Sequence, residues 1–189
     1  MSLPLQIAFL TGQSDPEGCA LAPAQAAFLE SLPAPPSAKL ARNFPYWEST
    51  PSYRETGLLR ASWNNARQYA AAGRPTFATR YRPDVLAMLG RAERHVLLAG
   101  SCGLELLAAL ELPAEVLARV HVFAYGPVAR RRPACDVQIV QGRRDWLSRA
   151  YFPTADARVD CGHLDYLECP AVRDLCRAFI ARQERNAVA

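Results

Sequence analysis

The chain has 189 residues, of which 50% are hydrophobic and only 21% are charged. This length and composition predict one globular domain over residues 1–189 and exclude an intrinsically disordered chain. The net charge of +4 is the difference between 22 basic and 18 acidic residues, and Lys39 is the single lysine. These basic residues form no stripe interleaved with aromatics, so we expect no nucleic-acid partner.

The start of the sequence, its apolar runs and its cysteines indicate where we expect the protein to reside. No apolar run approaches the roughly 20 residues of a membrane span, and the start "MSLPLQIAFLTGQ" lacks the basic region and cleavage site of a signal peptide. We therefore expect a cytoplasmic protein with no membrane partner. The six cysteines are irregularly spaced without a CxxC pair, which favours reduced thiols over disulfides or a zinc site.

Short apolar runs alternate with helical patterns along the chain. In chain order we predict a strand at residues 5–13, a helix at 22–32, a weak strand at 38–47, helices at 58–73 and 83–92, a strand at 94–101, a helix at 103–112, strands at 119–126, 135–142 and 157–163, and a helix at 170–183. This alternation predicts an α/β fold, with a mostly parallel central sheet and helices on both faces.

The segment "LLAGSCGLELL" places a serine where a strand turns directly into a helix. Ser101 has small residues two positions before and after it, Ala99 and Gly103. This pattern is typical of a nucleophile elbow, in which a strained turn exposes the hydroxyl group at the carboxyl end of a strand. Cys102 is the competing nucleophile, but its own frame has Leu104 where the turn needs a small residue, so we favour Ser101.

A nucleophilic serine needs a histidine base, and the chain has three histidines. His95 precedes the core of a strand and His121 lies inside one, so we expect both to be structural. His163 follows a glycine at the end of the last predicted strand. Since reactive groups in such sheets lie at the carboxyl ends of the strands, His163 is the candidate base.

The base in turn needs a carboxylate to orient it. Asp145 lies in a Gly-x-x-Asp loop just past the strand at residues 135–142, at the same edge of the sheet as Ser101. Asp160 is inside the last strand, and Asp165 is too close to the histidine to turn back on it easily. We therefore predict Asp145 as the acid.

The order Ser101, Asp145, His163, each after a strand, resembles the α/β-hydrolase superfamily over nearly the whole chain. The segments "FLTGQ", "LLAGSCG", "VQGRRD" and "DCGH" are similar to its oxyanion strand, elbow, acid loop and histidine loop. The resemblance implies a catalytic triad and an acyl-enzyme mechanism. The chain departs from the family pattern at Ala99, where a glycine is usual, and at the Thr-Gly-Gln of the oxyanion loop, where His-Gly is common.

Two backbone N–H groups are the candidate donors of the oxyanion hole. We assign one to Cys102 and the other to Gln13, with Ser14 as the alternate. Between the strands at 119–126 and 135–142 the connection is too short for a lid domain and tight even for a crossover helix. The expected protein is therefore a minimal hydrolase without a large lid, similar in this respect to dienelactone hydrolases.

Aromatic residues and arginines near the predicted cleft are candidates for substrate binding. Tyr46 and Trp47, with Tyr53 and Trp63, lie in the segment that often builds the acyl pocket in such folds. Arginines follow two strands, at residues 130–132 and 143–144. Arg131 and Arg144 are therefore expected to attract an anionic leaving group, such as coenzyme A or the acidic surface of an acyl carrier protein.

These features predict a serine hydrolase that cleaves a small-molecule acyl ester or thioester and needs no metal or organic cofactor. The candidate thioester substrates are those of an acyl carrier protein or of coenzyme A. Two alternatives remain open at the level of sequence. One is a catalytically silent member of the fold that binds a ligand or partner, and the other is an amidase or acyltransferase that uses the same three residues.

Overall fold

A single parallel sheet organises the molecule. The computed structural model describes residues 3–185, and every neighbouring pair of strands in its sheet is parallel. The spatial order is β2-β1-β3-β4-β5-β6. The strands are β1 (Leu3–Leu10), β2 (Lys39–Leu40), β3 (Ala92–Gly100), β4 (Val120–Tyr125), β5 (Asp136–Gly142) and β6 (Ala157–Val159). The predicted α/β class with a mostly parallel sheet is confirmed.

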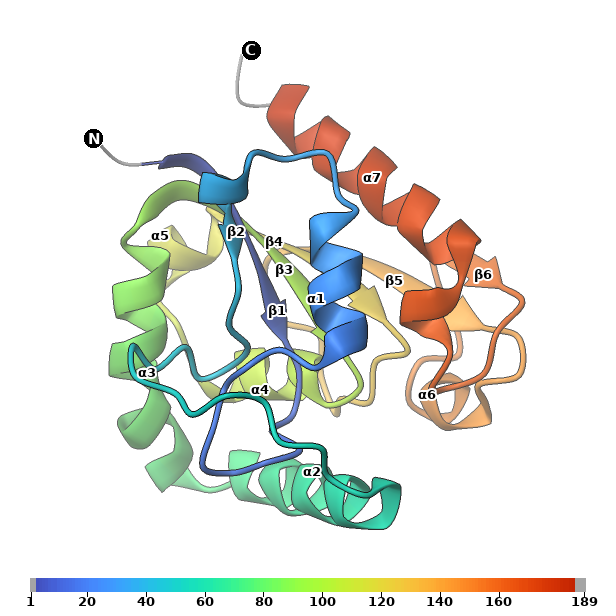
Figure 1. Cartoon of the computed structure of the whole chain (residues 1–189), viewed down its shortest axis with the longest axis horizontal. Coiled ribbons are helices and arrows are strands. Elements are labelled where there is room, and N and C mark those ends of the chain that lie inside the picture. Colours follow the sequence, from blue (N-terminus) through green and yellow to red (C-terminus); the bar gives the residue numbers. More distant parts are fainter. Residues whose placement is uncertain (1–2, 186–189) are drawn as a thin grey trace.

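Helices cover both faces of this sheet (Figure 1). They are α1 (Pro23–Glu30), α2 (Leu58–Ala72), α3 (Pro75–Leu89), α4 (Gly103–Ala109), α5 (Ala114–Leu117), α6 (Trp146–Tyr151) and α7 (Pro170–Arg185), with short 3-10 turns η1 (Pro36–Ala38) and η2 (Tyr166–Glu168). Helices α1 and α7 pack on one face, and α3 and α4 on the other. Among the described helices, none is both long and apolar enough to cross a bilayer.

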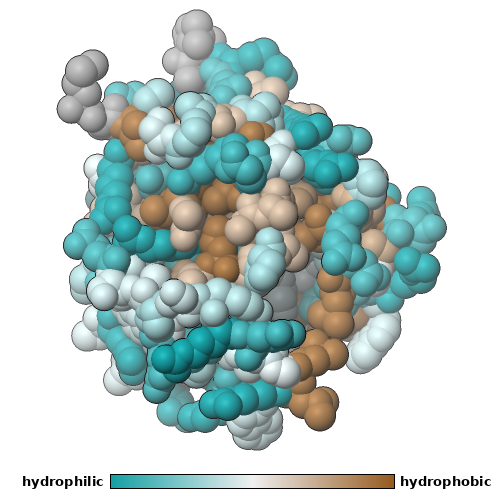
Figure 2. Space-filling model, in the orientation of Figure 1, coloured by the Kyte–Doolittle hydropathy of each residue, from teal (hydrophilic) through white to brown (hydrophobic). Residues whose placement is uncertain are grey.

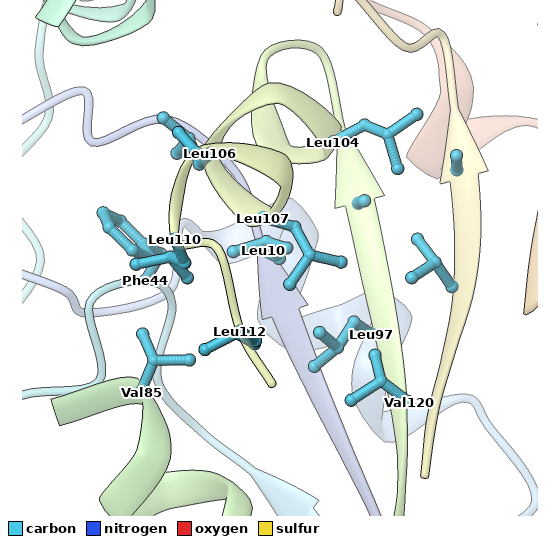
Figure 3. Close-up of a cluster of buried hydrophobic side chains, with 14 of the residues drawn as sticks. Leu10, Phe44, Val85, Leu97, Leu104, Leu106, Leu107, Leu110, Leu112 and Val120 are labelled. Carbon is cyan, nitrogen blue, oxygen red and sulfur yellow. The ribbon is translucent and has the colours of Figure 1, made fainter. Parts of the chain in front are cut away.

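Two hydrophobic clusters hold these layers together, because successive side chains of a strand point to opposite faces. Leu97 and Ala99 of β3 belong to the cluster beneath α3 and α4, whereas Val96 and Leu98 belong to the cluster beneath α1 and α7. Figure 3 shows the first cluster, in which the leucines of α4 pack against the strands. Full burial of one such leucine contributes about 2 kcal/mol to folding, so a strand buried on both faces is a rigid support.

The strand order reverses direction between β1 and β3. The chain passes from β1 to β2 on one side and then crosses back to β3 on the other. In open α/β sheets this switch point opens a crevice at the carboxyl ends of the two strands. Residues 11–13, which follow β1, and Ser101, which follows β3, therefore meet at this crevice.

Some element boundaries differ from the sequence predictions. The weak strand at 38–47 pairs over only two residues, because Asn43 instead binds the loop after β1, accepting from the Thr11 N–H group at 2.9 Å. Helix α3 begins at Pro75 and continues through Pro83, because its buried Phe77 and Val85 pack into the core on both sides of the proline. The short helices α5 and α6 were not predicted. The segment 126–135 between β4 and β5 contains no helix, as expected.

Candidate active site

Ser101 occupies a strained turn between β3 and α4. Its φ angle is 50°, in the left-handed region that costs a non-glycine residue about 1–3 kcal/mol and persists only under constraint. Close packing supplies the constraint, because a Cβ atom at Gly103 would lie 1.8 Å from the Leu10 carbonyl oxygen, and one at Gly100 would lie 2.5 Å from the Tyr125 ring. The small residues beside Ser101 thus let the turn fit between β1 and β4.

The imidazole of His163 lies between Ser101 and Asp145. Its Nδ1 atom is 2.9 Å from Asp145 Oδ2, and its Nε2 atom is 3.4 Å from Ser101 Oγ. The contact to the serine is long for a hydrogen bond. The structure therefore brings together the three residues that the sequence analysis singled out, each from a loop that follows a parallel strand.

The Asp145 side chain is fully buried and accepts three hydrogen bonds. Oδ1 accepts from the Ser148 N–H group at 3.0 Å, which caps α6, while Oδ2 accepts from His163 Nδ1 and from the Tyr166 hydroxyl group at 2.7 Å. Burial alone would raise the pKa of this carboxyl group, but these donors outweigh burial and lower the pKa below its ordinary value. Asp145 is therefore a carboxylate at neutral pH.

Tyr166 is a site residue that the sequence analysis missed. Its hydroxyl group accepts a hydrogen bond from the Gly142 N–H group at 2.7 Å and donates one to Asp145. Tyr166 thereby links the end of β5 to the carboxylate. Tyr166 lies three residues after His163, in η2. The available signal in the sequence was a tyrosine only three residues after the candidate base, since a tyrosine hydroxyl group that becomes buried usually finds a hydrogen-bond partner.

The remaining histidines and acids lie elsewhere. His95 is buried, its Nε2 lies 2.9 Å from the Leu89 carbonyl oxygen, and burial lowers its pKa. His121 pairs with Asp136 at 3.2 Å, away from the switch point. Both contacts agree with the structural roles expected for these histidines. Asp165 accepts from the Gly162 N–H group at 2.9 Å and shapes the turn that carries His163.

Cys102 is buried beside the elbow and does not resemble a nucleophile. Burial raises the pKa of its thiol group to about 12, so the thiol is protonated at neutral pH. Its Sγ atom packs against Gly12, lying 2.8 Å from the position of a Cβ atom there. The backbone of Cys102 precedes the first turn of α4, where N–H groups are free to bind an anion. All six cysteines are free thiols.

The second predicted donor of the oxyanion hole, the Gln13 N–H group, is already engaged. It donates to Gln68 Oε1 at 2.7 Å, and Gln68 Nε2 donates in return to Gln13 Oε1 at 2.9 Å. The alternate, Ser14, is held through its carbonyl oxygen by Asn64 Nδ2 at 2.7 Å. The Gly12 backbone, by contrast, lies against the Cys102 thiol group, with which its N–H group interacts.

A cavity of about 590 Å³ opens at the switch point, and Ser101 and His163 both line it. The loop after β1 and one face of α2 form two of its sides. Apolar groups dominate the rest of its wall, namely Tyr53, Tyr69, Val128, Leu147, Tyr151, Leu164 and Leu167. Such a lining suits a hydrophobic acyl or aryl group beside the serine. Of the aromatics proposed from sequence, Tyr53 lines this cavity.

The four residues predicted to bind substrate lie outside the cavity lining. Tyr46 is buried in the core, where its hydroxyl group donates to the Phe9 carbonyl oxygen at 2.9 Å. Trp47 donates to Asp84 at 3.1 Å. Arg131 turns away to the Ala108 carbonyl oxygen, and Arg144 is exposed in the loop before α6. Aromatic residues also build cores, and exposed arginines also bind backbone carbonyls, so composition alone does not place a residue at a cavity.

A buried carboxylate fixes the loop between β4 and β5. Glu105, in the first turn of α4, accepts from the Arg130 backbone N–H group at 2.7 Å and from its guanidinium group at 2.9 Å. The same guanidinium group lies 4.8 Å from the centre of the Tyr69 ring. Tyr69 also packs edge-on against Tyr151 of α6. These contacts join α2, α4 and α6 around the cavity.

No group of three or more potential His, Cys, Asp or Glu metal ligands occurs within residues 3–185. Comparison with known proteins adds no family assignment. No protein-family model matches the chain, and no curated protein matches it significantly in sequence.

Proposed function

We propose that this protein is a serine hydrolase of the α/β-hydrolase type, which cleaves an acyl ester or thioester through an acyl-enzyme. One observation carries the proposal: the hydrogen-bonded series from buried Asp145 through His163 to Ser101, with distances of 2.9 and 3.4 Å. The strained φ angle of Ser101 supports it, since such strain clusters at functional sites. The positions of the three residues after parallel strands also agree with that superfamily.

In the proposed reaction, His163 Nε2 takes the proton from Ser101 Oγ as this oxygen attacks the acyl carbon. The buried carboxylate of Asp145 keeps the remaining imidazole proton on Nδ1 and stabilises the imidazolium ion that forms. The bond to the leaving alcohol or thiol then breaks, and that group departs with the proton from Nε2. Water resolves the acyl-enzyme by the same steps, which returns the proton to Ser101.

The tetrahedral oxyanion needs two donors, and in this proposal the Cys102 N–H group is one. The second comes from the turn at residues 12–13. The Gly12 N–H group there faces the Cys102 thiol group, and the Gln13 N–H group becomes free only if Gln68 gives up its 2.7 Å contact. The role assigned to Gln13 from sequence therefore requires Gln68 to move when substrate binds.

The proposal is tested by trapping with a fluorophosphonate, followed by intact-mass measurement and peptide mapping. We expect one adduct on Ser101, none in Ser101→Ala, and a retained adduct in Cys102→Ala, because alanine preserves the backbone N–H group. Ser101→Ala should keep a residual catalysis of about 10³-fold over water. An adduct that persists in Ser101→Ala would refute the assignment. A folded protein that is never labelled would favour a silent ligand-binding member of the fold.

A further inference from the structure

Helix α2 leaves its large apolar side chains in solvent. Only Ala72 of its fifteen residues is buried. Leu58, Leu59 and Trp63 are 60%, 88% and 65% exposed. A helix of a globular protein normally turns such residues toward the core, so this exposure calls for a partner.

The exposed apolar residues continue the wall of the cavity. Ser62, Asn65, Ala66 and Tyr69 line the cavity from one face of α2. At 100° per residue, Leu58 and Leu59 extend that face past the mouth of the cavity, and Trp63 flanks it. The first turns of α2 therefore form an apolar edge beside the opening.

The opposite side of the opening has the same character. Trp146 at the start of α6 is 75% exposed, and Leu164, next to His163, is 70% exposed. The neighbouring Leu147 lines the cavity together with Leu164, so α2 and α6 border one opening. All the large hydrophobic residues that are exposed within residues 3–185 lie in these bordering segments, namely Tyr53, Leu58, Leu59, Trp63, Trp146, Tyr151 and Leu164. In Figure 2, brown apolar surface is exposed at the lower right, over the region where Figure 1 shows α6 and the first turn of α2.

Positive charge accompanies this apolar rim, which we define as Leu58, Leu59, Trp63, Trp146 and Leu164. The segments that carry most of it, α2 and residues 143–151, hold five exposed arginines and no exposed acid, since Asp145 is buried: Arg60, Arg67, Arg143, Arg144 and Arg149. Beside Leu164, the exposed carboxylate of Asp165 binds the Gly162 N–H group. None of these five makes an ion pair within the described residues. A surface of exposed Trp and Leu flanked by arginine is complementary to an anionic lipid surface, where apolar groups enter the acyl region and guanidinium groups remain at the headgroups.

We propose that the apolar rim docks this protein on the surface of aggregated anionic lipid. The consequence for substrate rests on the proposed hydrolase function: the acyl chain then enters the cavity from the lipid between α2 and α6. Lipid is a better match than a second copy of the chain, because a two-fold contact through the rim would oppose the same arginines. This proposal departs from the expectation from sequence of no membrane partner, and it rests on the exposure of these side chains, which no sequence pattern revealed.

The docking test uses Ser101→Ala, so that its outcome does not depend on hydrolysis. The probes are vesicles of phosphatidylcholine alone and of phosphatidylcholine mixed with phosphatidylglycerol. Two of the three tryptophans lie on the rim, so intrinsic fluorescence reports docking directly. We expect co-sedimentation and a blue shift with the anionic vesicles. The shift should vanish in Trp63→Phe combined with Trp146→Phe, which leaves only Trp47.

Rim variants separate the apolar and charged contributions. Leu59→Ser should weaken partition about tenfold through lost apolar burial. Arg60→Gln and Arg144→Gln should each weaken it about fivefold on anionic vesicles only. Arg119→Gln is the matched control, because this exposed arginine precedes β4 at the opposite edge of the sheet. Circular dichroism melting would check that every variant folds.

Three results would overturn the proposal. The first is the absence of binding to either kind of vesicle. The second is a concentration-dependent dimer that buries Trp63 and Trp146, which would assign the rim to a second copy. The third is salt-dependent, saturable hydrolysis of an acyl-carrier thioester without vesicle binding, which would assign it to an acidic protein. Labelling of Ser101 by fluorophosphonate in the wild-type protein does not depend on vesicle binding, so failure of docking and failure of the hydrolase function are distinguishable.

Discussion

Replacement of Asp145 by asparagine tests the candidate triad most directly. In the structure, Oδ1 caps α6 by accepting the Ser148 N–H group, and Oδ2 accepts from both His163 and Tyr166. An asparagine that keeps the cap must turn its Nδ2 group toward His163. This group would donate to Nδ1 and force the imidazole proton onto Nε2, which faces Ser101. The imidazole could then no longer accept the serine proton.

The expected loss of kcat is about 10⁴-fold, the magnitude known for this tautomer error in serine proteases. That factor corresponds to about 5 kcal/mol of transition-state stabilisation. The fold should survive, because the cap remains and the lost hydrogen bonds to a charged group cost about 2 kcal/mol. For a chain of this length the melting temperature should fall by about 4–8 °C.

The assay is hydrolysis of a short, soluble p-nitrophenyl ester, with thermal melting measured on the same preparation. Asp165→Asn is the matched control, because its carboxylate is near His163 in sequence but binds the Gly162 N–H group. That variant should keep most of the activity. Near wild-type turnover in Asp145→Asn, combined with inactivity in Asp165→Asn, would refute the reasoning and would assign the carboxylate that orients His163 to Asp165.

Two further variants examine contacts that the structure revealed. Tyr166→Phe removes a donor to Asp145 and should raise the pKa of that carboxyl group; because its pKa is lowered on folding, ionisation stabilises the folded protein at neutral pH, and this stability is lost as pH falls from about pH 5 through the folded pKa. The variant, with less of this stability to lose, should therefore melt lower than the wild type at neutral pH, and the difference between the two should shrink as pH falls below about pH 5. Superimposable melting profiles against pH would show that the tyrosine does not support the carboxylate. Gln68→Glu places a negative charge on the Gln13 N–H group and should lower kcat about tenfold or more, whereas Gln68→Ala, which frees that group, should retain activity within a few-fold. A large loss in Gln68→Ala would mean instead that the glutamine holds the loop in its active shape.

The grouping of Ser101, Asp145 and His163 was predictable because it follows from chain order and topology. Parallel strands place their carboxyl ends at one edge, so residues just after three strands meet there once the sheet is correctly identified. The small residues around Ser101 predicted the tight turn, because the neighbouring strands approach it too closely for larger side chains.

The contacts that depend on tertiary packing were not predictable. Helix α2 was expected with almost its observed ends, yet its pattern did not reveal that it borders the cavity or that Gln68 reaches Gln13. Tyr46 is a core residue whose hydroxyl group donates to the Phe9 carbonyl oxygen, and this contact joins residues that are distant in sequence. Arg131 likewise turned toward a helix carbonyl oxygen instead of the cleft.

The Glu105–Arg130 pair has a consequence for how this chain tolerates insertions. Loops are the usual places where homologous proteins gain residues, and the segment 126–135 is such a loop. Here, however, the backbone of Arg130 is bound to Glu105 of α4, and the guanidinium group of Arg130 packs on Tyr69, which lines the cavity. Lengthening this loop near Arg130 would therefore shift Tyr69, whereas lengthening it before Val128 would shift Ser101, whose carbonyl oxygen accepts the Val128 N–H group at 2.8 Å. If the proposed hydrolase function is correct, natural or designed variants that differ in loop length near Arg130 should diverge first in which acyl groups they accept, while keeping the same reaction.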